Sequence, residues 1–288
     1  MASAQVTGTT AQRPRAHGGA STHGRARDWA EIQERMLVPL YQAVYERLEV
    51  GSATSLLGLG CRSGLSLLLA AERGAEVAGL EPDTELRELA QGRHLRVSGP
   101  GHHDRPSGPF PRTAQSLVTL FELWQAPFLR QSGASRPSGE PGRPTPAQSV
   151  ARAAGLTLPG GHVVLAGWGP PERCESAAVL DVARRRAART PGCDPFALST
   201  PGALETLLTG AGLRPAGSGR VNCPFAYPDL ESAVRGMLST GLYEAAIEDS
   251  GAALVEKELE EALHPFVQRD ASVRMANLFR YVIAEKLR

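Results

Sequence analysis

Apolar residues in the first third of the chain form short continuous runs that alternate with runs at helical spacing. The continuous runs at 54–59 and 76–80 predict two buried strands. Between them, the leucine-rich segment 65–73 predicts a helix, and Gly74 suits the position just after its end. A further helix is expected from Pro82 to Gln91. Together these elements predict a βαβ unit whose two strands are parallel neighbours in a sheet.

The same alternation continues to the end of the chain. Residues 29–48 carry an apolar stripe at helical spacing, which predicts a helix that Asp28 caps. Further strands are predicted at 95–97, 116–121, 162–166, within 213–225, and at 273–284. Further helices are predicted at 149–154, 174–189, 200–209, 230–238, 243–247 and 251–264. Strands that alternate with helices predict an α/β fold, with one sheet and helices on both of its faces.

Two segments of the chain do not follow this pattern. Residues 1–27 have no apolar period and are rich in Gly, Thr, Ala and Arg, which predicts a disordered tail. Residues 130–148 are rich in Pro, Gly and Ser and lack large apolar side chains, which is typical of a flexible insertion. The remainder, residues 28–288, is predicted to be one domain that is long enough to bury a sizeable core.

The composition mainly argues against certain classes of partner and of segment. The chain is 42% apolar and 21% charged, with a formal net charge of +1, as in an ordinary globular domain. This balance gives no electrostatic reason to expect nucleic acid or a membrane as partner. The three consecutive arginines at 184–186 are interpreted as the solvated face of a helix and not as a nucleic-acid site. No apolar run reaches the length of a membrane span, and the N-terminus lacks the apolar core of a signal peptide. The oligomeric state is left open.

The cysteines and histidines do not predict a metal site. The four cysteines are far apart and form no C-x-x-C pair, which favours reduced thiols in a cytoplasmic protein: Cys61, Cys174, Cys193 and Cys223. His102 and His103 are adjacent, but no other His or Cys lies at ligand spacing, so a polar loop is the favoured interpretation.

The turn after the first predicted strand is rich in glycine, and the second strand ends at a carboxylate. The turn reads Gly58-Leu59-Gly60-Cys61-Arg62-Ser63-Gly64, and the carboxylate is Glu81. Glycines let the backbone come close to a ligand, and the start of a helix directs unsatisfied N–H groups toward it. The unit is therefore typical of a site for a nucleotide-like cofactor.

The order of these landmarks resembles the class I S-adenosylmethionine (SAM) dependent methyltransferases, in particular small-molecule enzymes of the ubiquinone-biosynthesis-like kind. In that family the first strand and loop read L-L-D-V-G-C-G-T-G, and Leu56–Gly64 stands in the same register. Glu81 matches the family acid that holds the ribose hydroxyls. Asp104–Phe110 aligns with the segment G-D-A-x-x-L-P-F, Gln115–Gln125 with the fourth strand, and Pro159-Gly160-Gly161 with the turn before the fifth. The resemblance covers residues 27–286, with 130–148 as an interruption.

This resemblance implies a Rossmann-like, mostly parallel sheet of seven strands whose last strand is antiparallel, with a helical cap at 226–266. It implies that SAM is the cofactor and that its methyl group passes in line to an oxygen, nitrogen or carbon of a small-molecule acceptor. The cofactor-binding residues that it implies are Gly58, Gly60, Cys61, Gly64, Glu81, Asp104 and Phe121. No general base is assigned, although four residues qualify by location: Glu122, His102, His103 and Tyr227.

Three residues depart from the family pattern. Gly58 replaces the loop acid that helps to hold the methionine amino group, Arg62 replaces a glycine, and Ser116 replaces the acid of the fourth strand. A guanidinium at position 62 would weaken binding of a sulfonium unless the side chain turned to solvent. These departures support a second hypothesis, a non-catalytic methyltransferase-like protein with a binding or regulatory role. A dehydrogenase is disfavoured because the sequence has no Tyr-x-x-x-Lys pair.

Overall fold

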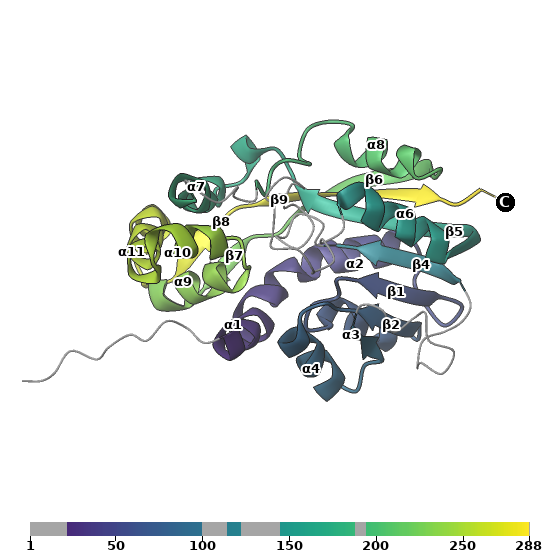
Figure 1. The fold of residues 1–288 in the computed structure, drawn as a ribbon, viewed down its shortest axis with the longest axis horizontal. Helices are drawn as coiled ribbons and strands as arrows, with labels where there is room; N and C mark the ends of the chain where they lie inside the picture. The colour runs from purple at the N-terminus through teal and green to yellow at the C-terminus, as the bar shows by residue number, and fades with distance from the viewer. Residues whose placement is uncertain (1–21, 100–113, 122–144, 188–193, 288) are drawn as a thin grey trace, which may run out of the picture.

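The computed structural model describes residues 22–99, 114–121, 145–187 and 194–287. Seven of the strands in these residues form one sheet in the order β3-β2-β1-β4-β5-β9-β6 (Figure 1). Neighbours from β3 to β5 are parallel, whereas β9 is antiparallel to both β5 and β6. The strands are β1 (Ser55–Leu59), β2 (Glu76–Leu80), β3 (Val97–Ser98), β4 (Gln115–Leu120), β5 (Thr157–Trp168), β6 (Arg214–Asn222) and β9 (Leu278–Glu285). The predicted fold class, a mostly parallel Rossmann-like sheet with an antiparallel last strand, is confirmed.

Alternate residues of the central strands face two separate cores, one on each side of the sheet. Leu56 and Leu117 belong to one core, and their neighbours Leu57 and Val118 belong to the other. The first core includes α2 (Val38–Arg47), α3 (Leu65–Glu72) and α4 (Thr84–Gly92), and the second includes α6 (Pro146–Leu156) and α8 (Ala203–Gly210). Because successive side chains of a strand point to opposite faces, strands covered on both faces need continuous apolar runs. Helices therefore cover both faces, as predicted (Figure 1).

The N-terminal helical run begins earlier than predicted. Helix α1 (Thr22–Asp28) continues through a π-helical turn, η1 (Trp29–Gln33), and a 3-10 turn, η2 (Glu34–Leu37), into α2. Asp28 thus lies within the run and does not cap it, and its carboxylate pairs with Arg235 instead. Because α1 includes residues 22–27, the tail that the sequence predicts for residues 1–27 does not extend to residue 27. Residues 1–21 lie outside the described residues.

Two further predicted boundaries are corrected. The last strand, expected at 273–284, is divided into β8 (Val273–Met275) and β9, and β8 pairs with β7 (Phe225–Tyr227) in a separate two-stranded sheet. Both halves are apolar, so the pattern gives no sign of the break. The segment expected to be flexible at 130–148 includes the start of α6, which Thr145 and Gln148 hold in a capping box. Residues 130–144 lie outside the described part of the chain.

Helices α9 (Leu230–Ser239), α10 (Glu244–Ser250) and α11 (Ala252–Leu263) group with α7 (Ala177–Arg186) beyond the carboxyl ends of the parallel strands (Figure 1). Helix α1 contacts both α9 and α4, so it joins this helical group to the first half of the sheet. Across the four described ranges, none of the helices has the length and apolar character that crossing a bilayer requires.

Candidate functional site

The glycine-rich loop at the carboxyl end of β1 is held by backbone hydrogen bonds to the end of β2. The N–H groups of Gly60 and Cys61 both donate to the carbonyl of Leu80, at 2.7 and 3.2 Å. Gly60, Arg62 and Gly64 have positive φ angles of 67°, 53° and 87°. Such angles strain any residue with a Cβ atom, so Arg62 holds a backbone conformation that glycine adopts more easily. The loop fits the glycine pattern except at this position.

Glu81 follows β2 directly and lies beside the loop. Its two carboxylate oxygens accept hydrogen bonds from backbone N–H groups, Oε2 from Arg62 at 2.7 Å and Oε1 from Asp83 at 2.9 Å. The residue is only 2% exposed. Burial raises the pKa of Glu81 above its ordinary value, and the nearby Arg62 charge opposes that rise. Each oxygen has a second lone pair, so the carboxylate can still accept hydrogen bonds from the hydroxyls of a ligand.

The side chain of Arg62 turns inward, which answers the question that the sequence left open. The residue is 9% exposed, and its guanidinium carbon lies 4.3 Å from the centroid of the Trp29 ring. Its Nη2 donates to the carbonyl of Ser239, at the end of α9, at 3.4 Å. Arg62 therefore links the glycine loop to the N-terminal helical run and to the helical group.

A second buried carboxylate, Glu34, contacts the end of the loop and the start of α3, and it is not among the residues that the sequence singles out. Glu34 Oε1 accepts from the N–H of Leu65 at 3.2 Å, and Oε2 accepts from the Ser63 hydroxyl and from Arg93. Burial raises the pKa of Glu34, and these partners oppose the rise. The apolar stripe of the predicted helix runs through Ile32 and Met36, and Glu34, two residues from each, would lie on the opposite face of a regular helix, so the sequence gives no sign of its burial.

The structure brings together five of the seven predicted site residues: Gly58, Gly60, Cys61, Gly64 and Glu81. Gly58 and Cys61 pack against each other, because a Cβ at Gly58 would lie 3.1 Å from the Cys61 Cβ.

The other two predicted residues are not placed at the loop. Phe121 lies at the carboxyl end of β4, where it is buried against the rings of Tyr41 and Tyr45, with centroid distances of 5.0 and 5.9 Å. Its role toward a cofactor stays a prediction. Asp104 lies outside the described residues, together with Glu122, His102 and His103.

Two other sequence candidates, Ser116 and Tyr227, make hydrogen bonds within the fold. Ser116 is interpreted above as a loss at a functional position, but its hydroxyl accepts from the N–H of Ser55 at 2.9 Å, at the amino end of β1. That end is the sheet edge opposite the glycine loop, so the interpretation of Ser116 is wrong. Tyr227 is buried and donates its hydroxyl proton to Gln33 at 2.7 Å. Burial raises its pKa beyond the range in which a base works at neutral pH.

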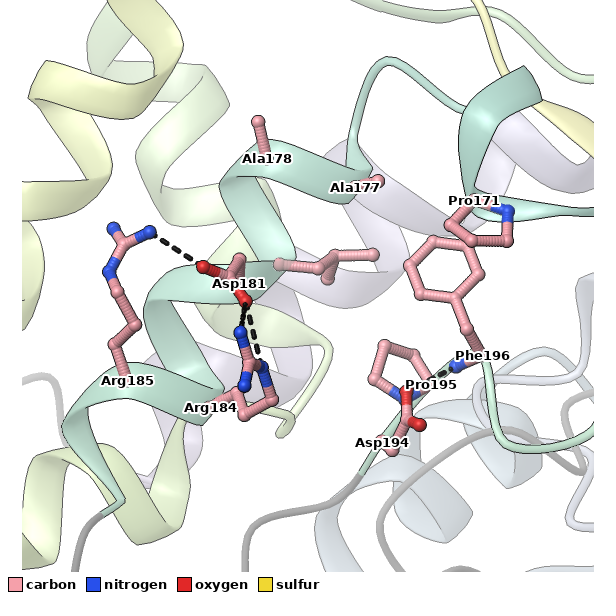
Figure 2. A pocket seen from close by; sticks show the side chains of 10 residues that line it. Pro171, Ala177, Ala178, Asp181, Arg184, Arg185, Asp194, Pro195 and Phe196 are labelled. Atoms are coloured by element: carbon pink, nitrogen blue, oxygen red, sulfur yellow. Dashed lines mark hydrogen bonds and ion pairs between the residues drawn. The ribbon is translucent and has the colours of Figure 1, made fainter.

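A pocket of about 420 Å³ lies beyond the carboxyl end of β5, between α7 and residues 194–196 (Figure 2). Its apolar wall includes Leu180 and Phe196. The Phe196 ring contacts the ring of Trp168, the last residue of β5, in a tilted arrangement with a centroid distance of 5.5 Å. Asp181 lies at the pocket with its carboxylate bound by Arg184 and Arg185, at 2.6 and 2.7 Å. With Asp194, the pocket is lined by two acidic and two basic side chains, so their formal charges balance and the pocket suits a small molecule with an apolar body.

The arrangement of the sheet can be compared with solved structures. YcgJ from Bacillus subtilis superposes with a TM-score of 0.52 at 14% identity, over 86% of this chain and 98% of that one. BH2331 from Bacillus halodurans C-125, a methyltransferase candidate, superposes with a TM-score of 0.52 at 13% identity, over 86% and 99%. The chain has the class I methyltransferase fold. A sarcosine dimethylglycine methyltransferase candidate from Galdieria sulphuraria also superposes, with a TM-score of 0.50 at 9% identity, over 93% and 99%.

At these identities the likeness concerns the methyltransferase fold alone. No protein-family model matches the sequence, and no curated protein does. Within this methyltransferase fold, the sheet order reverses direction between β1 and β4, and the glycine loop and Glu81 lie at the carboxyl edge beside that point. Open α/β sheets bind their ligands at such switch points. No cluster of metal-ligating side chains occurs in the described ranges.

Proposed function

We propose that the protein binds SAM at the glycine loop and transfers its methyl group to a small-molecule acceptor. One observation carries this proposal: Glu81, a buried carboxylate at the tip of β2, is hydrogen-bonded to the backbone of the loop that follows β1. A carboxylate at this place in a Rossmann-like unit accepts hydrogen bonds from ribose hydroxyls. SAM supplies the methyl group, and the role of this chain's residues is to hold the donor and the acceptor in attack geometry.

The residues fit the two ends of SAM unequally. The ribose end is matched by Glu81, whose oxygens keep lone pairs for hydroxyl donors. The methionine end has no acidic side chain at Gly58, and Arg62 adds a positive charge there. The fit therefore supports nucleoside binding more strongly than it supports the methyl donor.

We assign the acceptor to the pocket beside α7, because Phe196 and Trp168 connect it to the same carboxyl edge of the sheet. The helices at 226–266 are proposed to supply further acceptor contacts as a helical cap, since the end of α9 already reaches Arg62. The buried free thiols of Cys174 and Cys223 support a reducing compartment, and we propose the cytoplasm.

The alternative is a methyltransferase-like protein that binds a ligand without catalysis. The inward Arg62 and the glycine at position 58 favour it. Both functions share the nucleoside site at Glu81, but only the enzyme also needs an acceptor and turnover.

Calorimetric titration with SAM and with S-adenosylhomocysteine tests the proposal. Glu81→Gln should weaken binding of both by about tenfold or more, because it replaces a charged acceptor of two hydroxyl hydrogen bonds. Glu76→Gln is the matched control, since Glu76 lies at the other end of β2 in an exposed ion pair with Arg96. If neither nucleoside binds the wild type at millimolar concentration, the proposed site is wrong.

A turnover assay distinguishes methyl transfer from ligand binding without catalysis. Incubation with SAM and a panel of small apolar acceptors should release S-adenosylhomocysteine, and Ala178→Phe, which fills the pocket from an exposed position, should abolish the release without changing SAM affinity. Binding without release for every acceptor would favour the alternative.

A further inference from the structure

The charge of Arg62 lies close enough to Glu81, the carboxylate of the proposed nucleoside site, to oppose the rise in its pKa. Its backbone N–H is bound to the Glu81 carboxylate, and its guanidinium lies on the Trp29 ring and reaches the carbonyl of Ser239. The two partners of the side chain, Trp29 and Ser239, come from separate parts of the chain, so the inward direction of the side chain is determined by the fold. A side chain that is 9% exposed cannot leave its charge to bulk solvent.

The position of Arg62 in the unit identifies the part of the ligand that it meets. In a Rossmann-like unit, the carboxylate after the second strand holds the ribose, and the loop after the first strand holds the 5′ substituent. Arg62 belongs to that loop, whereas Glu81 follows the second strand. A nucleoside held by Glu81 therefore presents its 5′ substituent to the loop that carries Arg62. This step rests on the proposed function.

The carboxylates near the loop are already engaged elsewhere. Glu34 is bound by Leu65, Ser63 and Arg93. Asp83 caps α4 by accepting from the N–H groups of Glu85 and Leu86. Position 58, which faces the inside of the loop beside Cys61 and Leu67, is a glycine and carries no charge. Among residues 58–64, Arg62 is the only one with a charged side chain, so the loop itself contributes a positive charge beside the carboxyl group of Glu81.

We propose that Arg62 is a specificity-determining residue, which makes the site favour nucleosides whose 5′ substituent carries no added positive charge. S-adenosylhomocysteine and SAM form a matched pair for this purpose, because they differ by one methyl group and by the positive charge on sulfur. The neutral thioether is the favoured ligand, and the sulfonium is the disfavoured one. A site of this kind retains the demethylated nucleoside after transfer, or binds it without transfer.

The test is the ratio of the SAM and S-adenosylhomocysteine dissociation constants, measured by calorimetry on the full chain. In the wild type the ratio should be about tenfold or more, as expected for a partly buried charge close to the ligand. Arg62→Met and Arg62→Gln keep a long side chain without the charge, and both should reduce the ratio to about threefold or less. Arg62→Lys keeps the charge and should keep the ratio. Glycine is avoided because it would also relieve the positive φ of 53°.

The outcomes separate this proposal from the proposed function. Two results would overturn the role of Arg62 in specificity without affecting nucleoside binding. One is a wild-type ratio near one, and the other is a ratio that Arg62→Met and Arg62→Gln leave unchanged. If Arg62→Lys reduces the ratio as much as Arg62→Met does, the shape of the arginine side chain and not its charge determines the preference, which also overturns the proposal. If neither nucleoside binds the wild type or any variant, both the nucleoside site at Glu81 and the role of Arg62 in specificity are overturned.

Discussion

The carboxylate of Glu34 accepts a hydrogen bond from the backbone N–H of Leu65, the first residue of α3, at 3.2 Å. Helix N-termini attract anions, and in dinucleotide-binding proteins the pyrophosphate occupies this place. Here a side chain of the same chain occupies it, and the Ser63 hydroxyl donates to the same carboxylate. A pyrophosphate would have to displace Glu34, which agrees with the preference against a dehydrogenase.

Removal of Glu34 should destabilise the fold strongly. Glu34→Ala leaves Arg93 and the N-terminus of α3 without their buried anion, and we expect a loss of about 2–4 kcal/mol in the free energy of unfolding. The control is Glu46→Ala, since Glu46 is 72% exposed and lies 3.8 Å from Arg73. Its loss should stay below about 0.5 kcal/mol. Urea denaturation measures both, and equal losses would contradict the capping role.

The raised pKa of Glu34 gives stability a pH dependence of known sign. Below pH 4.5, its ordinary value, the group is protonated in both the folded and the unfolded chain. As the pH rises above 4.5, the unfolded chain loses this proton before the folded chain does, so the unfolded state is favoured. The free energy of unfolding of the wild type should therefore fall relative to Glu34→Gln until the folded-state pKa is passed. Parallel curves for the two proteins between about pH 4 and pH 8 would refute the shift.

Gly64 should tolerate alanine less well than a glycine with a similar backbone angle. Its φ is 87°, and a Cβ there would lie 2.4 Å from Leu95 Cδ1. Gly202 has a φ of 83°, but a Cβ there would meet no other atom within 4 Å, so this position isolates the backbone cost. We expect Gly202→Ala to cost about 1 kcal/mol and Gly64→Ala about 2–3 kcal/mol. Thermal or urea unfolding compares them, and equal costs would show that Leu95 adjusts freely.

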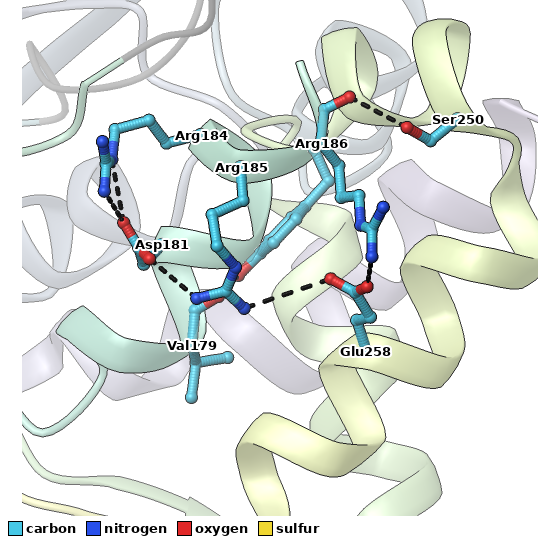
Figure 3. Close-up of polar contacts among 8 residues, drawn as sticks. Val179, Asp181, Arg184, Arg185, Arg186, Ser250 and Glu258 are labelled. Carbon is cyan, nitrogen blue, oxygen red and sulfur yellow. Dashed lines mark hydrogen bonds and ion pairs between the residues drawn. The ribbon is translucent and has the colours of Figure 1, made fainter. Parts of the chain in front are cut away.

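Glu258 should contribute more stability than a glutamate one turn further along the same helix. Figure 3 shows that Glu258, on α11, meets Arg185 and Arg186 of α7, while Ser250 donates to the Arg186 carbonyl at 3.0 Å. Its side chain is 15% exposed, whereas Glu261 is 66% exposed and pairs only loosely with Lys257 at 3.8 Å. Glu258→Ala should cost about 1–2 kcal/mol and Glu261→Ala less than about 0.5 kcal/mol in urea unfolding. A smaller cost at Glu258 would mean that the arginines find other partners.

The parts of the fold that depend on local pattern are predictable from the sequence. The second strand is predicted at 76–80 and observed at the same residues, and Gly74 has the positive φ of 93° that a helix end requires. The start of the N-terminal helical run is not predictable, because residues 22–27 are ordered by distant partners. Arg25, for example, pairs with Asp83 and Glu244.

In the candidate site too, some residues are predictable from local sequence and others are not. Glu81 and the glycines are recognisable because their spacing follows the βαβ unit. Glu34 and the direction of Arg62 are not, since both depend on side chains that meet only after folding: Arg93 for the first, Trp29 and Ser239 for the second. At Ser116 the sequence alignment misleads. It suggests a role in the cofactor site, but the residue lies at the amino end of β4, away from the carboxyl ends of the strands.

The place of β9 between β5 and β6 has a consequence for how the chain is made. In the described residues, β6 is an edge strand that is hydrogen-bonded to the sheet only through β9. A ribosome that has added everything up to Asn277 has therefore produced six of the seven strands, yet β6 has nowhere to dock and β5 presents an open edge. Unpaired edges of this kind invite wrong partners. The sheet can close only after residues 278–285 leave the exit tunnel, so β6 stays undocked until β9, the last strand of the sheet along the chain, has been made.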